Sequence, residues 1–79
     1  MSPWSPEENI AMERRHILEG ERRVARQEVL TGELIEKGYY RIANEAIELL
    51  KVMRETLELS RERLRHLEDR HGNAAKRRT

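Results

Sequence analysis

The fold of this chain is decided by residues 43–67, which read ANEAIELLKVMRETLELSRERLRHL. Small or apolar side chains recur here with a seven-residue period and fill both core positions of every heptad. These residues are Ala43, Ala46, Leu50, Met53, Leu57, Ser60, Leu64 and Leu67. Because such a stripe is too apolar to stay exposed in water, the segment predicts an amphipathic helix packed against a partner helix.

The residues before this stripe supply the partner helix. Ser5 is a suitable N-cap, Pro6 suits the first helical position, and Glu8 completes a capping box. No other proline follows Pro6, and Lys37 with Gly38 is typical of a helix C-terminus. We therefore expect a helix over 6–37, a turn over 38–40 and a second helix over 40–70.

A turn this short makes the two helices antiparallel neighbours. Placing it at Gly38 pairs residues whose numbers add to about 77, so that Gly20 faces Leu57 and Gln27 faces Leu50. A polar Gln27 in the seam suits a role in fixing this register. The predicted seam of this coiled-coil-like hairpin consists of Ile10, Ile17, Gly20, Val24, Gln27, Leu34, Ala43, Ala46, Leu50, Met53, Leu57, Ser60, Leu64 and Leu67.

Composition agrees with an all-α chain and limits its partners. Of 79 residues, 39% are charged and 4% aromatic, which is typical of exposed helices rather than a globular core. Sixteen basic and fifteen acidic residues are interleaved, so no strong field favours nucleic acid or a membrane surface. Without cysteine, a long apolar run or a secretion signal, we expect a cytoplasmic protein with no membrane partner.

Apolar residues outside the seam predict self-association. A single hairpin of this length buries few aliphatic side chains, and both helices carry additional ones. The simplest cover is a second copy, which would give a homodimer in the form of a four-helix bundle with two-fold symmetry. The predicted dimer interface consists of Leu18, Ala25, Val29, Ile35, Ile42, Ile47, Leu49 and Val52.

The ends of the chain complete the predicted domain organisation. Residues 1–5 are expected to be a disordered lead that ends in the N-cap, and 6–71 form the single helical hairpin. The run His71-Gly72-Asn73 is expected to stop the second helix. Residues 72–79 would then be a disordered basic tail, with Lys76, Arg77 and Arg78.

Two Glu-x-x-His patterns are the only candidates for metal chemistry. Glu13 with His16, and Glu68 with His71, each place a carboxylate and an imidazole on one helical face, as in di-iron bundles. In the predicted register the two pairs do not converge, so we expect no metal site and no cofactor. No catalytic nucleophile with a base partner is present either, and we expect a protein that is not an enzyme.

The most distinctive local string is EGERRVARQ, residues 19–27. It is interpreted mainly as a ladder of ion pairs within one helix, with a partner-recognition patch as the alternative. The intrahelical pairs we expect are Glu19 with Arg22 or Arg23, and Glu21 with Arg26.

Several short strings together resemble a group of small proteobacterial helical-hairpin proteins to which no activity is assigned. They are Arg15-His16-Ile17, Gly20-Glu21, Arg23-Val24, Arg26-Gln27, Leu30 to Leu34, Leu57-Glu58-Leu59 and Arg63-Leu64. The resemblance covers most of both predicted helices and implies a bacterial hairpin, without an active site to carry over. Those proteins tend to have a Gly-His-Asp turn where this chain has Gly38-Tyr39-Tyr40.

The sequence contains no pattern that names a biochemical activity. The favoured interpretation is a homo-oligomeric helical interaction protein, an adaptor or small regulator with an unidentified protein partner. The alternative is a nucleic-acid-associated regulator that uses Arg22, Arg23, Arg26 and the basic C-terminal tail.

Overall fold

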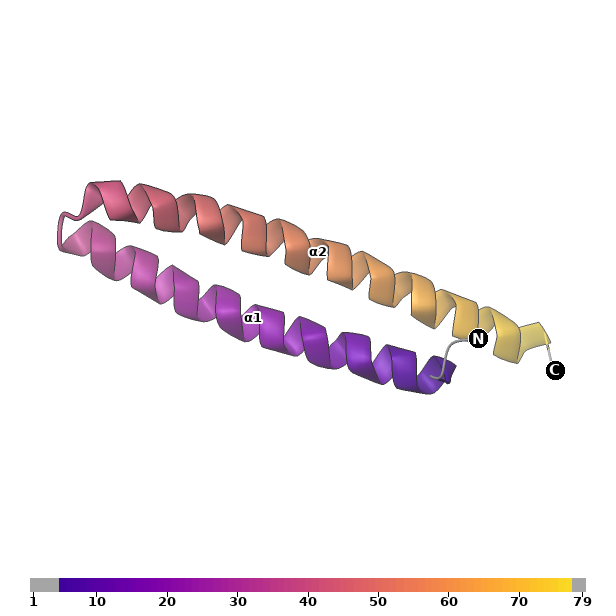
Figure 1. Ribbon diagram of the computed structural model, residues 1–79. Helices are drawn as coiled ribbons and strands as arrows, with labels where there is room; N and C mark the ends of the chain where they lie inside the picture. Colours follow the sequence, from indigo (N-terminus) through magenta and orange to yellow (C-terminus); the bar gives the residue numbers. More distant parts are fainter. Residues whose placement is uncertain (1–4, 78–79) are drawn as a thin grey trace.

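The computed structural model describes residues 5–77, and the side chains of 5–72. Two helices, α1 (Pro6–Glu36) and α2 (Tyr40–Arg77), lie antiparallel and form a hairpin of 61 × 19 × 18 Å (Figure 1). The described residues contain no strand. The predicted all-α, antiparallel two-helix hairpin is confirmed.

The start of α1 follows from its first four residues. Ser5 has extended backbone angles (φ −70°, ψ 161°), and its Oγ accepts a hydrogen bond from the Glu8 backbone N–H at 3.2 Å. Pro6 occupies the first turn, where its missing donor is not needed, and two glutamates there complement the helix dipole. The helix begins at the predicted residue, and the predicted disordered lead over 1–4 lies outside the described residues.

The turn is a Schellman motif built on Gly38. Its φ of +79° is in the left-handed region, which glycine adopts without a steric penalty. The Gly38 N–H donates to Ile35 O and the Tyr39 N–H to Leu34 O, both at 3.0 Å, so the last carbonyls of α1 are satisfied. The turn therefore spans 37–39, one residue earlier than predicted.

The predicted end of α2 at residue 70 is wrong, because the helix continues through Gly72 to Arg77. One glycine inside a helix costs about 1 kcal/mol, which does not end a helix that is already propagating. No proline follows, and Ala74 and Ala75 are strong helix formers. The expectation of a disordered tail is thus corrected as far as Arg77, and 78–79 lie outside the described residues. In Figure 1 the end of α2 extends past the start of α1.

The core is a single seam between the two helices. Its buried residues are Ile10, Glu13, Val24, Thr31, Ala43, Ala46, Leu50 and Leu57. Each of the fourteen predicted seam residues is buried or half-buried. Gly20 faces Leu57 as expected, since a Cβ on Gly20 would lie only 3.1 Å from Leu57 Cδ1. A glycine at this level lets the two backbones approach closely.

Polar groups in the seam are paired with one another or with the backbone. Gln27 Nε2 donates to the Ala46 carbonyl of α2 at 3.4 Å, and Thr31 Oγ1 donates to the Gln27 carbonyl at 2.7 Å. The buried Glu13 carboxylate lies 3.5 Å from Arg63 Nη1. Because an unpaired buried polar group is costly, the two contacts that cross between the helices, those of Gln27 and Glu13, favour one register over its neighbours.

Candidate protein-interaction surface

One long side of the hairpin is covered by ion pairs between the helices. α1 contributes one guanidinium and two carboxylates, spaced seven residues apart, and α2 contributes a partner of opposite charge to each. The pairs are Arg14 with Glu68 at 2.7 Å, Glu28 with Arg54 at 3.1 Å, and Glu21 with Arg61 at 3.5 Å. We call this surface the ion-pair side.

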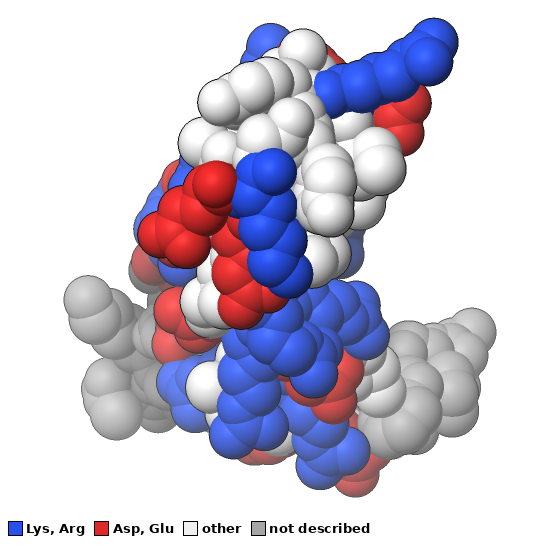
Figure 2. All heavy atoms as spheres, turned by 90° about the vertical axis from the view of Figure 1, so that its left-hand side faces the viewer, with Lys and Arg blue, Asp and Glu red and all other residues white. Residues whose placement is uncertain are grey.

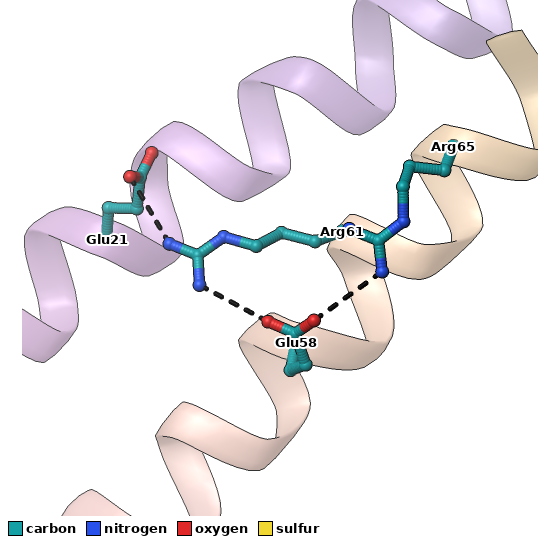
Figure 3. A network of polar contacts seen from close by, with 4 residues as sticks. All are labelled: Glu21, Glu58, Arg61 and Arg65. Atoms are coloured by element: carbon teal, nitrogen blue, oxygen red, sulfur yellow. Dashed lines mark hydrogen bonds and ion pairs between the residues drawn. The ribbon is translucent and has the colours of Figure 1, made fainter.

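Figure 3 shows how the Glu21 pair extends along α2. Glu58 lies between Arg61 and Arg65, and its two carboxylate oxygens are each 3.5 Å from one guanidinium. All four side chains are largely exposed, so each contact contributes about 0–1 kcal/mol. Their main consequence is that they cover the seam on this side, because aliphatic stems and paired charges occupy the groove between the helices.

The predicted intrahelical ladder on α1 is wrong in its pairing. Among the described residues, Glu19 forms no ion pair with Arg22 or Arg23, and Glu21 pairs with Arg61 of α2 instead of Arg26. Glu21 and Arg26 are five residues apart, which places them about 140° from each other around the helix, whereas Arg61 of α2 faces Glu21 directly.

The opposite long side carries a row of exposed aliphatic residues on α2. We define this apolar row as Ile42, Leu49, Val52 and Leu59, which are 52–60% exposed. Steps of three and seven residues keep them on one face. Residues two apart on a helix differ by about 200°, so Val52 and Leu59 point away from the ion-paired Arg54 and Arg61.

A groove of about 250 Å³ runs beside the apolar row. Val52 and Thr56 of α2 line one edge, while His16 and Arg23 of α1 line the other. Its floor includes Gly20, whose missing side chain leaves space between the helices. This side therefore combines exposed aliphatic surface with a cationic rim.

The structure divides the predicted dimer interface between different faces. Three of its residues, Ile42, Leu49 and Val52, belong to the apolar row. Leu18 and Ala25 instead fall between Arg14, Glu21 and Glu28, on the ion-pair side. All eight predicted residues are exposed, but one flat partner surface cannot cover both sides of a hairpin. The geometry therefore does not support one interface that contains all eight residues.

Two further predicted interface residues mark the turn end of the ion-pair side. Ile35 and Ile47 occupy the level that follows the Glu28 and Arg54 pair, and both are more than 40% exposed. Figure 2 looks onto this end and shows uncharged side chains gathered there, with acidic and basic ones around them. Leu59 is not in the predicted interface set, although its seven-residue step from Val52 places it in the apolar row.

In both Glu-x-x-His patterns, the glutamate forms an ion pair with an arginine of the other helix. Glu13 pairs with Arg63, and Glu68 pairs with Arg14. His71 Nε2 lies 3.5 Å from Glu7 Oε1. Over the described part of the chain, no three histidine or carboxylate side chains come close enough to hold a metal ion.

The outward rows of the two helices differ in charge. Arg22, Arg23 and Arg26 on α1 are exposed and form no ion pair with the residues that the structure describes. The outward row of α2 is acidic and exposed, with Glu48, Glu55, Glu62 and Asp69. The outward row of α2 is thus acidic, whereas the outward face of α1 carries both signs, with Glu19 and Glu33 exposed beside Arg22 and Arg26.

Comparison with known proteins provides no relative from which to infer a role: no protein family, curated protein or solved structure matches this chain. Neither helix contains, within the residues described, an apolar stretch long enough to cross a bilayer.

Proposed function

We propose that this protein is a non-enzymatic helical interaction module that forms a homodimer through its apolar row. The observation that carries the proposal is the contrast between the two sides. Ion pairs cover one side within the chain, whereas Ile42, Leu49, Val52 and Leu59 remain more than half exposed on the other.

Burial of this row would provide the driving force for association. Fully burying one Val, Leu or Ile side chain contributes about 1.5–3 kcal/mol, and the four residues form one contiguous stripe. Contiguous exposed aliphatic surface of this kind is typical of interaction sites. A second copy that covers the row completes a four-helix bundle with the same seam packing as the hairpin itself.

The cellular role that suits such a module is that of an adaptor or small regulator with a protein partner. The acidic outward row of α2 and the outward face of α1, which carries both signs, would remain accessible in a bundle closed through the apolar row. A partner protein could bind there without competing with self-association. Co-purification of a protein from the native cell that persists at high salt would support this role.

The dimer is tested with two variants of matched chemistry. Leu49→Glu places a charge in the apolar row, and Leu18→Glu places the same charge on the ion-pair side, at nearly equal exposure (52% and 49%). Light scattering should show a dimer for the wild type and for Leu18→Glu, and a monomer for Leu49→Glu. Circular dichroism checks that both variants stay helical.

Two results would contradict the proposal. The first is a monomeric wild-type protein at micromolar concentration. The second is an equal loss of dimer in Leu18→Glu and Leu49→Glu, which would show that the apolar row has no special part in association.

A second candidate function is supported by three arginines of α1 that form no ion pair with the residues described. Arg22, Arg23 and Arg26 are exposed within one and a half turns and could contact a phosphate backbone. For a nucleic-acid-associated regulator, binding to DNA or RNA would fall steeply with salt. Replacing Arg22 and Arg26 with Gln would weaken that binding and leave the dimer unchanged.

A further inference from the structure

We propose that the second copy packs antiparallel along α2, with the two-fold axis beside Leu50 and Lys51, so that the two turns lie at opposite ends. This inference rests on the self-association proposed above and specifies its geometry.

The first argument is the symmetry of the face that carries the apolar row. With the two polar residues that interrupt it, this face reads Ile42, Glu45, Leu49, Val52, Thr56, Leu59. Its order is apolar, polar, apolar, apolar, polar, apolar in both directions. Each residue has a counterpart of the same kind at equal distance from the midpoint between Leu50 and Lys51. A two-fold interface requires this self-complementarity, because residue i contacts j while j contacts i.

The antiparallel arrangement therefore matches every aliphatic residue of the row with another. Ile42 of one copy lies level with Leu59 of the second copy, and Leu49 lies level with Val52 of the second copy. The two polar positions, Glu45 and Thr56, also meet each other. No aliphatic residue of the row faces a charged one.

The second argument is charge complementarity at the groove. Leu49 of the second copy reaches the level of Val52, which lines the groove, and can insert beside it. Glu45 of the second copy reaches the level of Thr56, between the Arg23 and His16 side chains on the opposite edge. Because Arg23 has no ion pair among the described residues, its guanidinium is available to the incoming carboxylate.

The alternative dimer, with both turns at one end, lacks these features. It places α1 of the second copy over the apolar row. On that face α1 carries five charged or imidazole side chains and two apolar ones, namely His16, Glu19, Arg23, Arg26, Glu33, Met12 and Leu30. Aliphatic side chains would then be covered mainly by charged ones, which buries less apolar surface and desolvates guanidinium groups.

The arrangement is tested by distances between spin labels in the full chain. The protein has no cysteine, so single cysteines at Glu55, Glu62 and Asp69 can be labelled specifically. These exposed positions share one row of α2 at seven-residue steps. For the antiparallel dimer, the axial separations are about 14, 35 and 56 Å, because each residue of distance from the axis adds about 3 Å.

The outcomes separate this inference from the proposed function. A dimer whose label distance rises by about 20 Å per heptad supports the antiparallel arrangement. A dimer with equal distances at the three positions overturns it, while self-association stands. A monomer by light scattering, with no distance between labels, overturns both.

A charge exchange provides an independent check. Glu45→Arg and Arg23→Glu should each weaken the dimer by about tenfold or more, because each places like charges together at the groove. The double variant should restore the dimer to within about threefold of wild type. Neither residue belongs to an interhelical ion pair of the hairpin, so helicity serves as the folding control. Weakening that adds up in the double variant would overturn the proposed contact.

Discussion

The two long sides of the hairpin differ in what covers them. On the ion-pair side, charges from α1 and α2 meet at three successive levels, at 2.7–3.5 Å. On the other side, Leu49 and Val52 are more than half exposed next to an open groove. One side is completed within the chain, and the other requires a partner. The difference shows how a chain too small for a full core can direct its association to one face.

The largest loss of stability is expected from a substitution in the seam that separates the two sides. Leu57→Ala should lower the free energy of unfolding by about 2–5 kcal/mol, because Leu57 is buried against Val24 and Leu50 and its truncation leaves a cavity. Leu59→Ala is the matched control, since Leu59 lies two residues along and is 60% exposed. In urea unfolding of the monomer, Leu59→Ala should change the free energy of unfolding only slightly. Equal losses for the two variants would show that the sides are not distinct.

The next largest effects are expected from substitutions that change only the ion-pair side or only the apolar row. Arg61→Glu places a third carboxylate beside Glu21 and Glu58, and should destabilise the hairpin by about 1 kcal/mol without weakening the dimer. Val52→Ser should do the reverse, with a weaker dimer and nearly unchanged hairpin stability. Hairpin stability is best measured in the Leu49→Glu background, where association does not contribute. If both variants changed both quantities alike, the comparison would fail.

Salt should weaken the contacts of the ion-pair side more than the association through the apolar row. Raising the ionic strength from about 0.05 to about 1 M shortens the Debye length to about 3 Å and screens exposed pairs such as Arg14 with Glu68. We expect the hairpin to lose up to about 1 kcal/mol. Burial of the apolar row is not weakened by salt, so the dissociation constant should rise by at most about tenfold, through screening of the contact between Arg23 and Glu45. Sedimentation equilibrium at both ionic strengths measures this, and a dimer that dissociates in high salt would contradict an aliphatic interface.

The smallest effect concerns the centre of the proposed dimer. In the antiparallel arrangement, Glu48 lies closest to the axis among the outward acidic residues of α2, and it approaches its own copy. Glu48→Gln should tighten the dimer by about twofold, because it removes one like-charge contact. Asp69→Asn lies far from the axis and is the control. Tightening by both variants would point to general charge repulsion instead.

Much of this architecture could be predicted from local pattern. The seven-residue period located the seam, Ser5 and Pro6 located the start of α1, and the Gly38 turn was placed within one residue. Each of these features depends on side chains close together in sequence. The predicted end of α2 is too early, because a single Gly72 costs only about 1 kcal/mol and does not end the helix.

The ion pairs could not be predicted in the same way. Glu21 is close in sequence to Arg22, Arg23 and Arg26, yet it pairs with Arg61, forty residues away. Only the side-by-side placement of the helices brings that guanidinium within reach. The same placement separates Leu18 from Leu49, which are similar in type and exposure but face opposite sides of the hairpin.

The sequence by itself determined that two amphipathic helices form an antiparallel pair about one seam. The apolar period and the turn chemistry act locally and tolerate small errors of register. The tertiary structure alone decided which flank is closed by charges and which is left open. The reason is that an ion pair requires two side chains within about 4 Å across the helices, a condition that depends on register and rotation rather than on composition or period.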